Sequence, residues 1–170
     1  MELKDYIHTE LTGIERSVKR VTDSLTQQEL MWRPSSGCNS IGLILFHVAR
    51  LEDSFINTTI QSKPILWKTE KWYEKLHLAE NEEGAHYTIE QVNAFLVPEK
   101  QALLAFYGAV QAQTKGYLNS LTDDMLGQKI TMPRGGDVAI ASLFTFIISH
   151  ASGHIGEMSY LRGLQRGIDK

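Results

Sequence analysis

Residues 140–164 read IASLFTFIISHASGHIGEMSYLRGL, and this stretch decides the fold class. Apolar residues recur every three or four positions, which is the repeat of one helix face. One stripe consists of Ile140, Leu143, Ile147, His150, His154, Glu157, Leu161 and Leu164. A second apolar stripe beside it consists of Phe144, Ile148, Ala151, Ile155 and Met158. Because two adjacent stripes leave little of this helix for solvent, we expect His150 and His154 to point into a helical bundle.

Three more segments have the same spacing and are predicted to be helices. The first covers residues 3–25, with Leu3, Ile7, Leu11, Ile14, Val18, Val21 and Leu25 in its stripe. The second begins after Asn39 or Ser40, either of which can cap a helix, and runs to about Ser62 through Ile41, Ile44, Val48, Leu51 and Phe55. The third contains Leu103, Tyr107, Val110, Thr114, Tyr117 and Leu121. The sequence therefore predicts an all-α four-helix bundle, in one domain spanning residues 1–170.

The connections differ in length. Lys63 to Tyr87 shows no sustained period, which predicts a long crossover between the second and third helices. Thr26 with Glu29, and Thr88 with Gln91, have the spacing of capping boxes, and we expect Pro98 to kink or restart the third helix. GQKITMPRGGD, residues 127–137, is a turn-rich connection in which a small hairpin fits. LTQQEL at 25–30 and LTDDML at 121–126 follow the first and third helices in the same way, a short internal echo.

Composition excludes several classes of protein. Lys plus Arg number 17 against 20 Asp plus Glu, a formal charge of -3, so no basic footprint for nucleic acid is present. The N-terminal MELKDYIHTEL lacks a continuous apolar run, and no stretch of about eighteen apolar residues occurs. The single cysteine, Cys38, has no partner for an internal disulfide. These features favour a cytoplasmic protein that neither spans a membrane nor binds nucleic acid.

His150 and His154 interrupt an apolar stripe, so each needs a polar partner if it is buried. Two histidines at i and i+4 can bind one metal ion, and catalytic zinc sites typically have three protein ligands. His47 is the best third candidate, because it lies between Ile44 and Leu51 on the apolar side of its helix. HxxxH also occurs by chance, so spacing alone leaves hydrogen-bonded core histidines as an equal interpretation.

Two segments change that balance. LTQQELMWRPSSGCNSIGLILFHVARLEDSFI, residues 25–56, and SHASGHIGEMSYLRGLQRG, residues 149–167, resemble the corresponding segments of DinB-like proteins. The resemblance extends to PILW and KWYEKL in the crossover and to LLAFYGAVQAQTKGYL in the third helix. It implies a four-helix bundle, frequently dimeric, with one divalent ion on three histidines. At the matching positions the ligands are His47, His150 and His154.

The chain departs from the family after the last histidine. Many relatives have H-R-G-Q there, whereas this chain has His154-Ile155-Gly156-Glu157, so any role of that arginine is in doubt. Glu157 lies one turn beyond His154. It is a candidate to accept a hydrogen bond from a ligand imidazole, orient a water in catalysis or become a fourth ligand. An exposed carboxylate without a function is an equal interpretation.

Other residues are weaker candidates. Arg50 follows His47 by three positions and suits an anionic substrate, although a solvated charge or a structural ion pair is the more ordinary role. We expect Glu52 and Asp53 to face water, His8 to lie at the rim, and His77 and His86 to be solvated in the crossover. Trp67, Trp72 and Tyr73 can roof the pocket, but packing the crossover onto the bundle is their more ordinary role.

The resemblance implies one of two kinds of enzyme. The first is a metal-dependent hydrolase, in which a metal-bound water is the nucleophile. The second is a transferase that uses a low-molecular-weight thiol, in which a metal-bound thiolate is the nucleophile. Nitrogen ligands suit zinc or nickel, and also iron or manganese. The alternative is a stress-response protein that binds a metal or small molecule without turnover. An enzyme should have an open coordination position, whereas a storage site should be closed by a fourth protein ligand.

Overall fold

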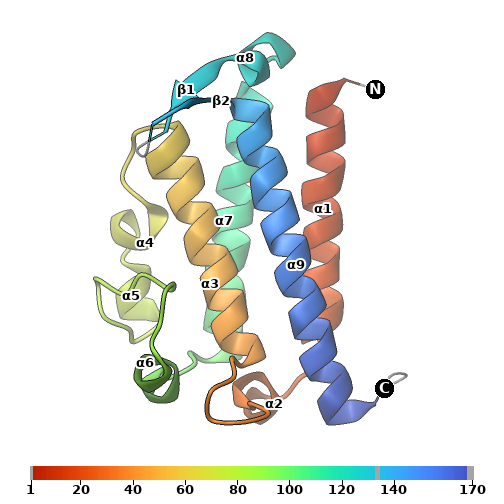
Figure 1. The fold of residues 1–170 in the computed structure, drawn as a ribbon, viewed down its shortest axis with the longest axis vertical. Helices are drawn as coiled ribbons and strands as arrows, with labels where there is room; N and C mark the ends of the chain where they lie inside the picture. Colours follow the sequence, from red (N-terminus) through yellow and green to blue (C-terminus); the bar gives the residue numbers. More distant parts are fainter. Residues whose placement is uncertain (1, 133–134, 168–170) are drawn as a thin grey trace.

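The computed structural model describes residues 2–132 and 135–167. The bundle consists of α1 (Leu3–Thr22), α3 (Ile41–Asp53), α7 (Lys100–Ser120) and α9 (Ile140–Arg166) (Figure 1). Ser40 caps the start of α3 by accepting a hydrogen bond from the amide of Leu43, and a π-helical segment, η1 (Ser54–Ile60), continues α3 at its other end. The predicted all-α four-helix bundle is therefore confirmed.

The direction of the helices explains the long crossover. In Figure 1, α1 and α9 run downward, whereas α3 and α7 run upward. Each of α3 and α1 packs against both α7 and α9. Because α3 and α7 are parallel neighbours, the chain must return along the whole bundle between them. Residues 61–99 make this return, which includes the predicted crossover Lys63–Tyr87 and extends to the start of α7. They contain α4 (Leu66–Thr69), α5 (Trp72–Lys75) and α6 (Ile89–Ala94).

Aromatic side chains attach the crossover to the bundle. Trp67 and Trp72 are buried, and each ring lies 5.4 Å from the ring of Phe106 on α7. Tyr73 packs beside Trp67. These residues therefore pack the crossover onto the bundle. Thr88 and Gln91 form the predicted capping box of α6, and the helix restarts after Pro98, with α7 beginning at Lys100.

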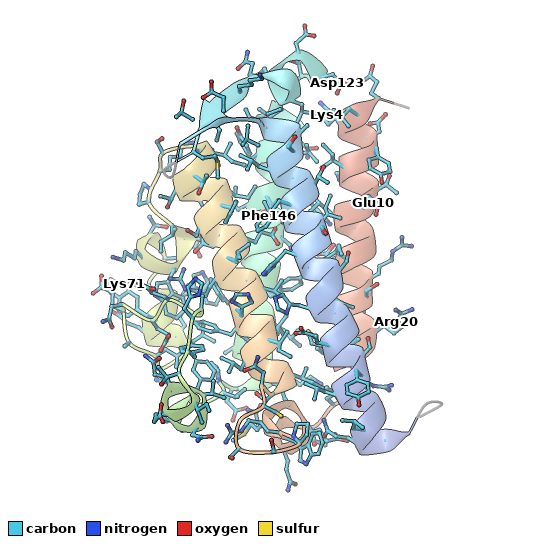
Figure 2. The ribbon with its side chains drawn as sticks, viewed as in Figure 1. Lys4, Glu10, Arg20, Lys71, Asp123 and Phe146 are labelled. Carbon is cyan, nitrogen blue, oxygen red and sulfur yellow. The ribbon has the colours of Figure 1, made fainter. Side chains whose placement is uncertain are left out.

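The ends of the bundle are less covered than the sequence indicates. Leu3 and Leu164 belong to the predicted stripes but are 43% and 50% exposed, because each lies near the free end of its helix. Asp123 nevertheless caps α1 from another segment. Its carboxylate accepts hydrogen bonds from the amides of Leu3 and Lys4, and Figure 2 shows Lys4 and Asp123 together at this end.

The internal echo is a repeated local structure. After α1 and α7 the chain forms two short helices, α2 (Gln27–Met31) and α8 (Asp123–Gly127). Thr26 and Thr122 cap them through the same hydrogen bond, and Leu30 and Leu126 are both buried. Glu29 completes the predicted capping box in α2. After α8 the chain forms the small hairpin, with β1 (Lys129–Thr131) antiparallel to β2 (Asp137–Ala139); residues 133–134 of its loop lie outside the described residues.

The prediction that Glu52 and Asp53 face water is wrong. Glu52 is 1% exposed and Asp53 0%. Glu52 accepts hydrogen bonds of 2.6 Å from Gln111 and Thr114 of α7, while Asp53 accepts from the amides of α4. The physical reason is that α3 is covered by α7, by α9 and also by the crossover, so it has almost no face left for solvent.

No helix among the described residues combines the length and the apolar character needed to span a membrane.

Candidate metal centre

Three partly buried imidazoles from two antiparallel helices converge between α3 and α9. His150 and His154 are one turn apart on α9, and His47 faces them from α3. The Nε2 atom of His150 lies 3.0 Å from Nε2 of His47 and 3.1 Å from Nε2 of His154. One nitrogen from each of the three residues lies within 4.8 Å of the others. The structure thus brings together the three histidines that the sequence indicates.

The outer nitrogens of two rings determine which nitrogens face the centre. Nδ1 of His47 lies 2.7 Å from the carbonyl oxygen of Gly84, and a carbonyl only accepts, so this Nδ1 carries the proton. Nδ1 of His154 lies 2.8 Å from a carboxylate oxygen of Glu157, which fixes its proton in the same way. In the neutral rings, Nε2 of both residues is then a lone pair that points at the centre.

This donor set fits a metal ion. Nε2 of His150 lies about 3 Å from both other nitrogens, and nitrogen lone pairs at that distance repel each other unless a proton or a cation lies between them. Two nitrogens at 2.0–2.1 Å from a tetrahedral zinc ion are about 3.3 Å apart, close to the observed spacing. The described residues contain one such group of potential ligands, and it consists of these three histidines alone.

The environment of His47 and His150 favours the neutral form of both rings. Burial lowers the pKa of His47, although the Gly84 carbonyl opposes that effect. Burial, together with the neighbouring His154 and His47, lowers the pKa of His150 to about 4. Neutral imidazole is the form that binds a metal, so at neutral pH these two rings need lose no proton to do so.

Cavities adjoin the three imidazoles. One of about 280 Å³ reaches both His47 and His154, between Leu43 and Ile44 of α3 and the loop of the crossover. A second, of about 500 Å³, reaches His47 past Leu51 and Phe55. A third, of about 350 Å³, opens on the outer side of α9 at His150, His154 and Glu157. The convergence point is therefore accessible to small molecules.

The other candidate residues have varied positions. Glu157 is 56% exposed, contacts Nδ1 of His154 and is outside the ligand group, so here it orients a ring. Arg50 is buried in a structural ion pair with Asp53. His86 is exposed and lines both crossover-side cavities, whereas His77 and His8 are exposed elsewhere.

The sequence reasoning missed Gly84 entirely. Gly84 contributes a backbone carbonyl, which every residue type has and which the sequence therefore cannot distinguish. It lies in a loop, 37 residues from His47. Its neighbour Glu82 was also missed: one carboxylate oxygen accepts hydrogen bonds from the Tyr87 hydroxyl and the Gly84 amide. The sequence did offer one signal: the crossover, which has no helical periodicity, follows the helix that carries His47. That signal points to the crossover as a region and does not identify Gly84 or Glu82.

Fold and site together define a class of protein: a four-helix bundle with two parallel neighbouring helices and a three-histidine group that could hold a metal ion. The chain belongs to the DinB superfamily, whose family model matches residues 10–158.

Two solved structures are similar to the chain. A conserved protein from Enterococcus faecalis is 25% identical, with a TM-score of 0.84 over 96% of this chain and 97% of that one. YfiT from Bacillus subtilis is 15% identical, with a TM-score of 0.62 over 96% of this chain and 87% of that one. YfiT is described as a probable metal-dependent hydrolase with an unusual four-helix bundle topology. No curated protein matches the sequence.

Proposed function

We propose that the protein is a divalent-metal-dependent enzyme, either a hydrolase or a thiol-dependent transferase, with His47, His150 and His154 as the metal ligands. One observation carries this proposal: the ligand group consists of three imidazoles among the described residues, and cavities reach it. Catalytic zinc sites typically use three protein ligands and keep another position open, whereas structural sites use four. The description of YfiT as a probable metal-dependent hydrolase supports the hydrolase branch.

A divalent ion supplies Lewis acidity, which lowers the pKa of a water or a thiol so that it becomes a nucleophile near neutral pH. The Gly84 carbonyl and the Glu157 carboxylate direct the Nε2 atoms of His47 and His154 at Nε2 of His150. Leu43 and Ile44 give one cavity an apolar wall beside His47 and His154. His86, at the rim of two cavities, is placed to contact a substrate.

The donor set limits the cofactors. Imidazole nitrogen is a good ligand for zinc and nickel and also binds iron and manganese, so zinc or nickel is our first choice. For the transferase branch the second cofactor is a low-molecular-weight thiol, and the substrate is a small molecule in either branch.

The test is elemental analysis of natively purified protein, followed by a turnover screen on the same preparation. The screen contains small esters and amides, and electrophiles supplied with low-molecular-weight thiols. We expect about one divalent ion per chain and turnover that a chelator abolishes. Stoichiometric metal without turnover in any arm would favour the alternative, a non-catalytic binding protein of stress physiology. Absence of metal after purification in metal-supplemented buffer would reject the site itself.

We also propose that the protein is a cytoplasmic homodimer. Along α9, Phe146, Tyr160 and Leu164 are exposed at 43%, 69% and 50%, and exposed apolar side chains can be covered by a second copy. Light scattering should give the mass of a dimer at micromolar concentration. A monomer throughout that range would reject the association.

A further inference from the structure

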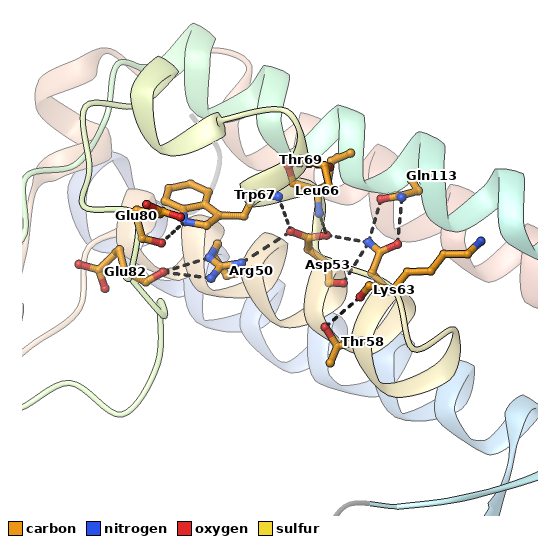
Figure 3. Close-up of polar contacts among 11 residues, drawn as sticks. Arg50, Asp53, Thr58, Lys63, Leu66, Trp67, Thr69, Glu80, Glu82 and Gln113 are labelled. Atoms are coloured by element: carbon orange, nitrogen blue, oxygen red, sulfur yellow. Dashed lines mark hydrogen bonds and ion pairs between the residues drawn. The ribbon is translucent and has the colours of Figure 1, made fainter.

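Arg50 lies one turn beyond His47 on α3 and is only 7% exposed. Its Nε and Nη2 atoms donate hydrogen bonds of 3.3 and 3.0 Å to the carbonyl oxygen of Glu82. Its guanidinium lies 4.8 Å from the ring centroid of Trp67, and Nη1 is 3.6 Å from a carboxylate oxygen of Asp53 (Figure 3). An arginine is suited to this position because its planar guanidinium can stack on an aromatic ring, form an ion pair with a carboxylate and donate hydrogen bonds to a carbonyl at the same time. Arg50 thus connects α3 to two parts of the crossover.

The carboxylate of Asp53 makes this connection rigid. It accepts hydrogen bonds of 2.8 and 2.9 Å from the amides of Leu66 and Trp67, at the start of α4, and another of 2.8 Å from Asn57 (Figure 3). The same carboxylate therefore fixes α4 and faces Arg50. Because both groups are buried, movement of either one would leave a polar group without a partner.

The segment that Arg50 holds, residues 80–87, has one further attachment to the rest of the crossover and is closed by hydrogen bonds of its own. The Trp67 indole donates a hydrogen bond of 2.9 Å to the carbonyl of Glu80. The Tyr87 hydroxyl donates one of 2.6 Å to a carboxylate oxygen of Glu82, which also accepts from the amide of Gly84 at 3.3 Å. Glu80 and Glu82 therefore attach the segment to Trp67 and Arg50, and the internal bonds of the Glu82 side chain hold Gly84 and Tyr87 to that attached part.

Gly84 links this segment to the metal centre. Its φ is +75°, and a Cβ atom there would lie 3.0 and 3.1 Å from Cγ and Cβ of Arg50. Gly84 therefore packs directly on the stem of Arg50, in a conformation that favours glycine. Its carbonyl oxygen is the one that lies 2.7 Å from Nδ1 of His47. Arg50 thus contacts both the segment and the glycine whose carbonyl orients the ring.

We propose that Arg50 is a positioning residue for the metal centre. By holding residues 80–87 it keeps the Gly84 carbonyl where it selects the Nδ1–H form of His47 and directs Nε2 at His150 and His154. This inference deepens the proposed function and relies on it for the metal-affinity measurement. Outer partners of metal-binding histidines typically contribute about 10- to 100-fold to metal affinity, which sets the scale of the effect.

The experiment uses the full chain and two variants. Arg50→Lys keeps a cation beside Asp53 but lacks the paired donors to the Glu82 carbonyl. Tyr87→Phe removes one internal hydrogen bond that shapes the segment around Gly84, without touching the buried ion pair. The matched control is Arg33→Lys, because Arg33 also binds the crossover, at Val92 and Asn93 of α6, away from Gly84. Circular dichroism and thermal unfolding verify that each variant is folded.

Two quantities are measured. Competition between the protein and a chromophoric chelator for Zn²⁺ gives the dissociation constant, which we expect to rise about tenfold in Arg50→Lys, severalfold in Tyr87→Phe and not in Arg33→Lys. ¹⁵N NMR of the histidine rings in the metal-free protein gives the tautomer of His47. We expect Nδ1–H in the wild type and in Arg33→Lys, and a shift toward Nε2–H in the other two variants.

The two measurements separate the two proposals. If wild-type protein does not bind Zn²⁺, the proposed function fails, while the His47 tautomer still tests the positioning role. If Arg50→Lys keeps both the wild-type tautomer of His47 and the wild-type Zn²⁺ affinity, the inference is overturned. If Arg50→Lys does not fold, a wild-type tautomer and affinity in Tyr87→Phe would overturn it instead. Equal losses in Arg33→Lys would also overturn it, because any loosening of the crossover would then suffice.

Discussion

The two helices that supply the imidazoles support them in different ways. On α9, Nδ1 of His154 meets Glu157, which is three residues further along the same helix and 56% exposed. On α3, Nδ1 of His47 meets a carbonyl 37 residues away, in a loop held by buried polar groups. One ligand is thus oriented by local helix geometry, and the other by tertiary structure. A change to the groups that support His47 should therefore affect folding and metal binding together, whereas a change to Glu157 should affect metal binding alone.

The strongest way to break this comparison is Asp53→Ala. The carboxylate is fully buried, and its loss leaves two α4 amides without an acceptor and Arg50 without its anion. We expect the free energy of unfolding to fall by about 3–5 kcal/mol, measured by urea denaturation. Glu157→Ala on α9 is the control and should change it by less than about 0.5 kcal/mol. Equal losses of unfolding free energy in the two variants would mean that the polar groups on α3 stabilise the fold no more than Glu157 on α9 does.

His154→Ala tests the α9 side at the metal itself. The apolar stripes of four helices are enough to fold the chain, so the variant should stay helical with an unfolding free energy within about 2 kcal/mol of wild type. Zn²⁺ affinity should fall by more than about 100-fold, beyond the loss expected for an outer partner. Circular dichroism, metal content and thermal unfolding are measured on one preparation. An unfolded variant would make the site structural and weaken the enzyme proposal, and full metal content would show that His154 is not a ligand.

The same contrast explains what the sequence can predict. On α9 the stripes and the i, i+3 and i+4 relations of His150, His154 and Glu157 follow from helix periodicity, so their common face was correctly expected. The capping boxes and the crossover were also predictable, because they depend on local residue types. The burial of Glu52 and Asp53 was not, because it depends on which segments cover α3 after the chain returns. The Gly84 carbonyl has no side-chain signature at all.

Glu52→Gln extends the comparison of α3 and α9 to the pH dependence of stability, because Glu52 on α3 is a buried acid whereas Glu157 on α9 is exposed. Burial raises the pKa of Glu52 from 4.5 to about 7, against the opposing effect of its bonds to Thr114 and Gln111. Between pH 4.5 and 7 the folded state therefore keeps a proton that the unfolded state has lost, so stability falls as pH rises through this range. Above pH 7 we expect Glu52→Gln to be more stable than wild type by about 2 kcal/mol, with the difference shrinking toward pH 5. Urea denaturation from pH 5 to 8 checks this, and a difference independent of pH would contradict it.

The smallest expected effect belongs to Glu157→Gln, on the exposed side of the site. The amide retains an oxygen that can accept from Nδ1 of His154, but it loses the negative charge that strengthens this hydrogen bond and makes the ring a better ligand. Because the carboxylate is 56% exposed, solvent already screens much of that charge. We expect Zn²⁺ affinity to fall by about tenfold or less, with unfolding by urea unchanged in metal-free protein. Glu157→Ala, which also removes the acceptor, should lose more affinity than Glu157→Gln, again without a change in stability. If instead Glu157→Gln abolishes metal binding, the carboxylate is a ligand in solution, the site has four protein ligands, and the storage interpretation gains over the enzyme.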